Sequence, residues 1–443
     1  MKKTLISLAV ASIVTSSLFA DAQTDALKSE LKALTERLNS IETQTVETEE
    51  KTDSLLQEVA DSKVADSFGN YNGQSYAGMA PGASKVYTNK NKLSIGGYGK
   101  VDYINYRDQT TKTSAGTTKT ADQSNSYRAI IYVGYRFTDN IIFNSEIEFE
   151  HGGDTVEVEQ LSLDFLVNDM LNFRVGTYVV PIGLVSVNHE PTLFNPVNRP
   201  LTERNIIPST WYENGGMVYG SFIDSTLSYR TGIVSGFNAS KGATLRKMRG
   251  EGKKSAADDA GYYLRLDYAP SENFNIAGSY YYGNAGQNSS KSIANGAVVD
   301  VNLEDVSINL YEVHATAKYA GFEANALYAV HKISDADKVA IFNGKDATKE
   351  GFGYYANLNY TYGDWVPFAQ YEVSNAFDSG YQADGITATN YANQKDITFG
   401  INWKTHPQIV LKADYIVGKL DDRTNTGTAI NNDRFELGMG YVF

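Results

Sequence analysis

Apolar and polar residues alternate with a period of two from Lys92 to the carboxyl terminus. Clear examples are YRAIIYVGYRF (127–137), IIFNSEIEFE (141–150), YYLRLDY (262–268) and IVLKADYIV (409–417). Successive side chains of a strand point to opposite faces, so each segment predicts a strand with one apolar face and one charged face. Alternation is also typical of soluble sandwiches, in which one face of each sheet meets water. The pattern alone therefore leaves both architectures open.

The lengths of the connections favour a membrane barrel. Tight links alternate with long polar connections, which span residues 109–125, 236–258, 283–303, 334–348, 375–394 and 420–432. Short turns on one side and long loops on the other are typical of outer-membrane barrels. We therefore predict an all-β transmembrane antiparallel β-barrel of about 16 strands over residues 92–443, with both termini on the short-turn side.

Three segments precede the predicted barrel. Residues 1–22 place Lys2 and Lys3 before a short apolar run and end in a small-x-small cleavage site, which predicts a signal peptide. A membrane anchor is the alternative, but a spanning helix needs roughly 20 apolar residues. Residues 67–91 are rich in Gly, Ser and Asn and have no period, so we interpret them as a linker or a plug-like segment.

Residues 23–66 carry a seam with spacings of four and three. Its members are Leu27, Leu31, Leu34, Leu38, Ile41, Thr45, Thr48, Thr52, Leu55 and Val59. The alternative is one amphipathic helix packed on another domain, but the narrow stripe and its Glu and Lys flanks favour a self-associating coiled coil. Such a rod would extend about 50 Å at about 1.5 Å per residue, and we place it in the periplasm. Its oligomeric order stays open.

Composition and charge narrow the function. The chain has no Cys but 31 Tyr and 38 Gly, as expected of many Tyr-rich strands, and its net charge of −13 leaves the barrel mildly acidic. A basic run at 241–254 could bind lipopolysaccharide phosphates or attract anions, although a solvated loop is the better explanation. This run lacks interleaved aromatic residues, so nucleic-acid binding is not expected.

The stretch HEPTLFNPVNRPLTERNIIPSTWYENGG, residues 189–216, is the most unusual connection. Structureless connections longer than roughly a dozen residues are usually functional or disordered. It carries both charge signs between stiffening prolines, at Glu190, Arg199, Glu203, Arg204 and Glu213. We expect acidic loop residues to face cations of the barrel wall, for which the candidates are Lys100, Arg128, Arg136 and Lys412. The alternative is that these charges pair merely to hold the loop against the wall.

Catalysis and metal binding have little support in the sequence. His189 and Glu190 could form an acid–base pair and Ser209 could be a nucleophile, but no known catalytic spacing surrounds them. Among five His and no Cys there is no pair at i, i+4, so no local set of metal ligands is visible. We expect no enzyme, no cofactor and no metal site.

Four motifs carry a resemblance to a known family: SIGGYGKVDY (94–103), PIGLVSVNHEP (181–191), VNRP (197–200) and IIPSTWYENGG (206–216). From residue 83 onward the chain resembles Gram-negative outer-membrane porins of a family near the phosphate-selective porins. The final Phe443 resembles the terminal residue by which such barrels are recognised for assembly. The resemblance implies a homotrimer. In general porins of sixteen strands, the third long loop, here 181–216, folds inward and narrows the pore.

The sequence therefore predicts a porin in the bacterial outer membrane, in contact with lipid and lipopolysaccharide, that passes small hydrophilic solutes and ions by passive diffusion. The first alternative is a channel selective for phosphate or another anion. The second is a structural protein that tethers the envelope through its coiled coil, by contact with peptidoglycan or another envelope protein.

Overall fold

The computed structural model describes residues 21–60, 71–107, 109–113, 116–295, 297–389, 393–420 and 430–443. The chain divides into two compact units, residues 1–65 and residues 66–443, and each is described by itself. Except for its last two residues, the predicted signal peptide lies outside the described residues, as do residues 61–66 of the predicted coiled coil and 67–70 of the predicted linker.

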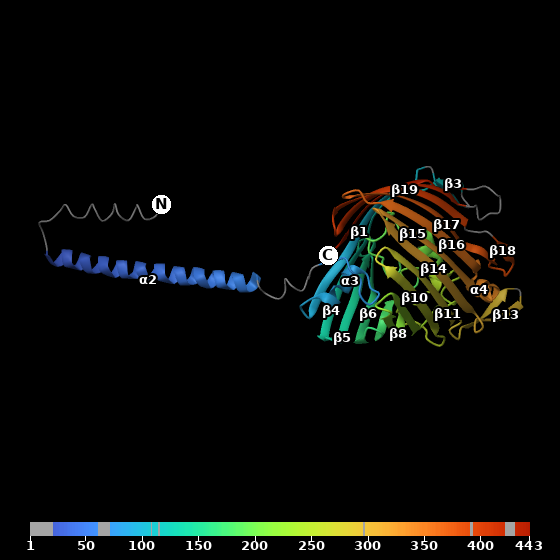
Figure 1. Cartoon of the computed structure of the whole chain (residues 1–443), viewed down its shortest axis with the longest axis horizontal. Coiled ribbons are helices and arrows are strands. Elements are labelled where there is room, and N and C mark those ends of the chain that lie inside the picture. The colour runs from blue at the N-terminus through green and yellow to red at the C-terminus, as the bar shows by residue number, and fades with distance from the viewer. Residues whose placement is uncertain are drawn as a thin grey trace. The chain divides into compact units, whose positions relative to one another are not determined.

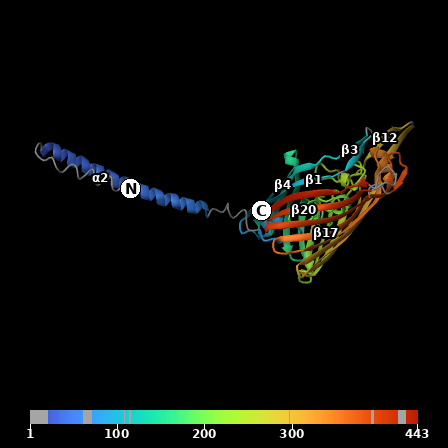
Figure 2. The same cartoon turned by 90° about the horizontal axis from the view of Figure 1, so that it is seen from above.

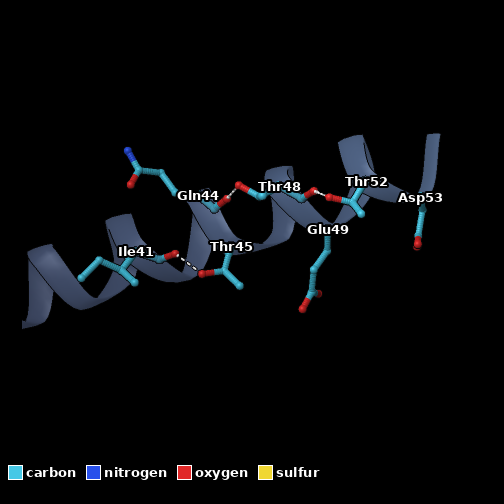
Figure 3. Close-up of a pocket in the computed structure, with 7 residues that line it drawn as sticks. All are labelled: Ile41, Gln44, Thr45, Thr48, Glu49, Thr52 and Asp53. Carbon is cyan, nitrogen blue, oxygen red and sulfur yellow. Dashed lines mark hydrogen bonds between the residues drawn. The ribbon is translucent and has the colours of Figure 1, made fainter. Parts of the chain in front are cut away.

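The described residues of the first unit form one helix, α2 (Asp21–Ala60). The apolar seam positions from Leu27 to Ile41 are all exposed, at 47 to 62%. Figure 3 shows that the threonines which continue the seam turn their hydroxyls onto backbone carbonyls one turn earlier, as from Thr45 to Ile41 and from Thr52 to Thr48. Within the described residues, no helix combines the length and apolarity needed to cross a membrane.

The second unit is a closed barrel of sixteen antiparallel strands in the described part of the chain (Figure 1). The strands are β1 (Leu93–Asn105), β4 (Gln123–Thr138), β5 (Ile141–Glu150), β6 (Thr155–Asn168), β7 (Leu171–Val179), β8 (Tyr212–Phe222), β9 (Leu227–Val234), β10 (Gly261–Ser271), β11 (Phe274–Asn284), β14 (Ser307–Tyr319), β15 (Phe322–Ile333), β16 (Ala347–Tyr360), β17 (Trp365–Tyr381), β19 (Asn393–His406), β20 (Ile409–Leu420) and β22 (Arg434–Val442). The predicted strand number is confirmed.

The last strand closes the sheet against the first. In the β1–β22 ladder Tyr98 lies opposite Val442 and Tyr103 lies opposite Leu437. Beyond the strand end, the Phe443 amide donates to the Gly97 carbonyl (2.8 Å), and the Gly97 amide donates to the Phe443 carbonyl (3.1 Å). Closure gives the backbone groups of both edge strands, β1 and β22, hydrogen-bond partners. Within a membrane such pairing is required, because lipid offers no hydrogen-bond partner.

The two faces of the wall are those that the alternation predicts. On β10, Leu264 is 43% exposed on the outer face, whereas its neighbour Arg265 is 3% exposed and points inward. On β5, Ile147 and Phe149 likewise alternate with the buried Glu146 and Glu148. An apolar exterior therefore surrounds an interior rich in charged side chains.

The long connections carry short elements of their own. These are the hairpins β2–β3 (Thr110–Thr113, Gly116–Lys119) and β12–β13 (Ser290–Asn295, Ala297–Asn302), the helix α4 (Ala336–Asn343), the short turns η3 (Thr202–Ile206) and η4 (Leu245–Met248), and the strands β18 (Thr387–Thr389) and β21 (Ile430–Asn431). The short turn η2 (His151–Gly153) lies in the tight connection between β5 and β6. The hairpins lie at the end of the barrel opposite the carboxyl terminus (Figure 2). Most of the predicted connection 420–432 lies outside the described residues.

Residues 71–91 are not a simple linker, because they contain the helix α3 (Pro81–Thr88), which the sequence did not predict. Wall side chains that point inward donate hydrogen bonds to the backbone of α3. Arg136 of β4 reaches the carbonyls of Val86 and Tyr87, both at 2.9 Å, and Asn144 of β5 reaches that of Ala83 at 2.7 Å. The helix therefore packs against the inner face of the barrel, as the plug-like interpretation expected.

Candidate functional site

The connection between β7 and β8, residues 180–211, runs through the barrel interior. It lies between the fifth and sixth strands, as predicted. Side chains from well-separated wall strands bond to its backbone: Arg265 of β10 donates to the Gly183 carbonyl (2.6 Å), Glu372 of β17 accepts from the Thr202 amide (2.7 Å), and Asp414 of β20 accepts from the Val197 amide (2.7 Å). We call this segment the interior loop. The interior loop contains no strand, and side chains of the wall supply the hydrogen-bond partners that its buried backbone needs.

Glu203 ties the two ends of the interior loop together. Its Oε1 accepts hydrogen bonds from the amides of Leu184 (3.1 Å) and Val185 (2.9 Å) and from the Tyr355 hydroxyl of β16 (3.0 Å). Burial raises the pKa of this carboxyl to about 7. Gly183 has a φ of +94°, and a Cβ there would collide with Glu203 Oε2, so a glycine is required.

Glu190 connects the interior loop to α3. It is fully buried, and its Oε1 accepts a hydrogen bond from the Gly82 amide at 2.7 Å. Burial raises the pKa of Glu190 to about 7, although the bond from Gly82 acts in the opposite direction. The neutral form is favoured because desolvation disfavours a charged carboxylate.

Glu213 belongs to β8 and not to the interior loop, which corrects its expected position. Its carboxylate accepts from the Trp211 indole (2.9 Å), the Gly250 amide (2.7 Å) and the Ser235 hydroxyl (2.6 Å). It thereby attaches the basic run 241–254 to the wall. All three acidic candidates are thus buried hydrogen-bond acceptors that hold segments in place.

Arg199 and Arg204 are placed differently, because they line a cleft beside the interior loop. The cleft has a volume of about 40 Å³, room for a few water molecules, and its other cationic side chains are those of Lys100, Arg128 and Arg246. In the described part of the chain, none of Arg199, Arg204 and Arg246 forms an ion pair with a carboxylate. Arg246 instead donates to the carbonyl of Ser209 (2.7 Å). Its pKa is lowered to about 9 by burial and by the neighbouring guanidinium groups.

The four wall cations do not face acidic loop residues, contrary to expectation. Lys100 pairs with Asp102 (2.9 Å), and Arg128 pairs with Glu148 (3.1 Å) and Glu150 (2.8 Å). Their ionic partners are therefore carboxylates of the wall itself, and Lys100 also donates to the Asn198 side-chain oxygen of the interior loop.

The other two wall cations bind backbone. Lys412 donates to the Phe194 and Pro196 carbonyls of the interior loop, and Arg136 donates to the carbonyls of α3. The physical reason is that the interior loop and the last turn of α3 present carbonyls without backbone partners, and these compete for the available cations.

The structure brings together three residues that the sequence did not connect: Glu146 of β5, Glu159 of β6 and His189 of the interior loop. One ligand atom of each lies within 4.8 Å of the others. No local spacing could reveal this cluster, because its members come from three separate segments. The only available signal was the inward phase of Glu146 and Glu159 on their strands.

The proposed acid–base use of His189 finds no geometric support. Its Nδ1 lies 2.8 Å from the Ser186 carbonyl, and its Nε2 lies 3.1 Å from Glu146 Oε1. Both ring nitrogens are therefore occupied, and neither is left to activate the Ser209 hydroxyl, as a nucleophile would require.

A protein of Aquifex aeolicus (strain VF5), described as an uncharacterized protein, is 32% identical to this chain over 400 residues. The match covers 83% of this chain and 84% of the Aquifex protein. The chain belongs to the family of this protein. No family model matches the sequence.

Among solved structures, the outer membrane channel DcaP of Acinetobacter baumannii is similar, with a TM-score of 0.51 and 11% identity over 79% of this chain and 97% of DcaP. OmpF of Salmonella typhi gives a TM-score of 0.48 and 15% identity, over 80% of this chain and 98% of OmpF. The likeness to DcaP shows a shared fold, that of an outer-membrane barrel.

The raised pKa values of Glu190 and Glu203 predict a pH-dependent stability. Both values, about 7, exceed the ordinary value of 4.5, so the folded state binds these protons more tightly than the unfolded chain. Their contribution is complete below about pH 4.5 and is lost as the pH rises through 7, on the order of 3 kcal/mol for each carboxyl. Urea unfolding in lipid vesicles should therefore give a higher free energy of unfolding at pH 5 than at pH 8.

The double variant Glu190→Gln/Glu203→Gln should lose much of this pH dependence, since Gln resembles the neutral carboxyl. Asp384→Asn, which alters an exposed loop carboxylate, serves as the control and should keep it. An identical pH dependence in the double variant and the wild type would contradict the assignment.

Proposed function

We propose that the chain forms a water-filled channel in the bacterial outer membrane, through which small hydrophilic solutes and ions diffuse down their gradients. The observation that carries the proposal is the closed barrel with an apolar exterior and a charged interior. An exterior of this kind suits lipid, and a charged interior suits water and dissolved ions. The fold shared with an outer-membrane channel supports the same conclusion.

The interior loop is the constriction in this proposal. Its backbone is bonded to strands that lie far apart in the closed sheet, and it borders the narrow cleft of Arg199 and Arg204. Glu190 and Glu203 hold it in place, while the arginines provide its charge toward the solute. A polar constriction of this kind replaces part of the hydration shell of a passing ion and sets a barrier by sign.

Swelling of liposomes that contain the full-length protein tests the channel directly. We expect rapid swelling in arabinose and progressively slower swelling as the sugar becomes larger, because a narrow aqueous path discriminates by size. Liposomes that contain the heat-denatured protein are the control. Swelling no faster than in this control would contradict diffusion and would favour a tethering role.

A preference for anions is the second candidate function, favoured by the cationic cleft. Four arginines line it, and in the described residues three of them, Arg199, Arg204 and Arg246, pair with no carboxylate. Their local positive charge is opposite in sign to the net negative charge of the chain. The electric field in a narrow path is set by the nearest charged groups, so the arginines determine it. Phosphate or another small oxyanion is the kind of solute that guanidinium groups bind well.

The double variant Arg199→Gln/Arg204→Gln should shift the reversal potential in a KCl gradient toward that of a cation-preferring channel. Lys247→Gln removes an exposed cation of the nearby basic run and should leave the potential nearly unchanged. Equal shifts in both proteins would mean that the cleft does not lie on the ion path.

We further propose that the chain is a homotrimer joined by a periplasmic coiled coil at α2. The exposed leucines of the seam support self-association, since an unpartnered apolar stripe gains free energy by burial. Thr45, Thr48 and Thr52 bond their hydroxyls to their own helix, so no hydroxyl needs a partner across the seam.

Leu31→Asp/Leu38→Asp should release monomers in size-exclusion chromatography with light scattering, because charge would enter the seam. Ser29→Asp/Thr43→Asp adds the same charge on the opposite side of the helix and should leave the trimer intact. Conductance per barrel should stay unchanged in both variants. Trimers that survive the leucine substitutions would contradict the proposed role of the helix.

A further inference from the structure

The buried cluster of Glu146, Glu159 and His189 is unlike the other charged groups of the interior. All three side chains are almost completely inaccessible, with 1%, 2% and 4% exposure. One carboxylate oxygen of each glutamate and one ring nitrogen of His189 lie within 4.8 Å of one another. The cluster joins the interior loop to two neighbouring wall strands, β5 and β6, and of its three members only His189 also borders the cationic cleft.

The contacts of His189 orient a lone pair toward Glu146. The Ser186 carbonyl, 2.8 Å from Nδ1, can only accept a hydrogen bond, so Nδ1 carries the proton. In the neutral ring Nε2 is then an acceptor, and it faces the carboxylate oxygen of Glu146 at 3.1 Å. Two acceptors at this distance repel each other unless a proton or a metal ion lies between them. A backbone carbonyl that holds the other ring nitrogen is also the usual partner of a metal-binding histidine.

Glu159 adds a second carboxylate, and one of its two oxygens lacks a hydrogen-bond donor. Its Oε1 accepts from the Thr210 hydroxyl at 3.0 Å, but its Oε2 has no hydrogen-bond partner among the described residues. The wall guanidinium of Arg128, which interacts electrostatically with Glu159, is paired with Glu148 and Glu150. An unpaired buried carboxylate oxygen is costly, and a bound cation would satisfy it.

The small cavity and the distance between His189 and Glu146 suit a small metal ion. Zinc lies about 2.0–2.2 Å from His nitrogen and carboxylate oxygen, so two ligands of one ion are separated by roughly the 3.1 Å found between His189 and Glu146. A cavity of about 20 Å³ borders both of these residues and has room for one water molecule as a further ligand. One imidazole with two carboxylates favours Zn²⁺ or a similar transition metal over Ca²⁺, which prefers oxygen ligands alone.

We propose that Glu146, Glu159 and His189 form a site for a divalent transition metal such as Zn²⁺. The ion fastens the start of the interior loop to β5 and β6, and three protein ligands plus one water complete a four-coordinate sphere. The site is a structural clamp of the loop. It binds metal whether or not the barrel conducts.

The test uses untagged, full-length protein, stripped with a chelator and then equilibrated with ZnCl₂. Elemental analysis after dialysis should find one Zn²⁺ per protomer in the wild type, and X-ray absorption should show only nitrogen and oxygen ligands near 2.0–2.2 Å. Glu159→Gln keeps the size of the side chain and its bond to Thr210, and it should weaken Zn²⁺ binding at least about tenfold. His189→Gln should abolish the binding.

His314→Gln is the matched control, because His314 is also buried and pairs with a glutamate, Glu312. It belongs to no group of three metal-ligating residues in the described part of the chain, so this variant should keep its zinc. Circular dichroism and the heat-dependent gel shift of folded barrels show which variants are folded. Absence of Zn²⁺ from the folded wild type, or equal Zn²⁺ in the wild type and Glu159→Gln, would overturn the proposal. The cluster would then be a protonated histidine paired with Glu146.

Discussion

Every backbone amide and carbonyl within a bilayer needs a hydrogen-bond partner from the protein itself, and the closed β1–β22 ladder meets this requirement. Closure also determines where the side chains go. Once the strand order is circular, one side of every strand faces lipid and the other faces the interior. The charged half of each alternating segment, such as Arg265 and Glu146, must therefore be accommodated inside. The rest of the structure follows from how those interior charges are satisfied.

Some interior charges pair with neighbouring wall charges, as Arg128 does with Glu148, and others bind backbone groups of the interior loop and of α3. Arg136 and Lys412 bind carbonyls of α3 and of the interior loop, while Glu203 and Glu372 bind amides. Burial raises the pKa of Glu203 to about 7, although the hydrogen bonds from the amides of Val185 and Leu184 act in the opposite direction. The interior loop is thus held by many polar contacts.

Much of the architecture was readable in the sequence because its causes are local. The period of two assigns each residue to a face, and the alternation of short and long connections identifies the barrel and places the interior loop after the fifth strand. The helix α3 was missed because eight residues that begin with Pro81-Gly82 have little helical signal. Its stability comes from the wall, and not from its own sequence.

The roles of individual charges were harder to predict because they depend on contacts between distant segments. A carboxylate that bonds to amides, as Glu203 does, resembles in sequence one that lines a pore. The pairing of Glu190 with Gly82 joins residues 108 positions apart. The cluster of Glu146, Glu159 and His189 is likewise a product of the fold. A single sequence predicts which face of a strand a side chain lies on. The residue that the side chain contacts on that face is known only from the structure.

Single-channel recording in planar lipid bilayers tests the central claim most directly, that this barrel is an open aqueous path. The purified full-length protein should insert in events of three equal conductance steps, one for each barrel of a trimer, and the conductance should increase with the KCl concentration. A bilayer that contains folded, inserted protein and shows no steps would contradict the account and leave a closed barrel with a structural role in the envelope.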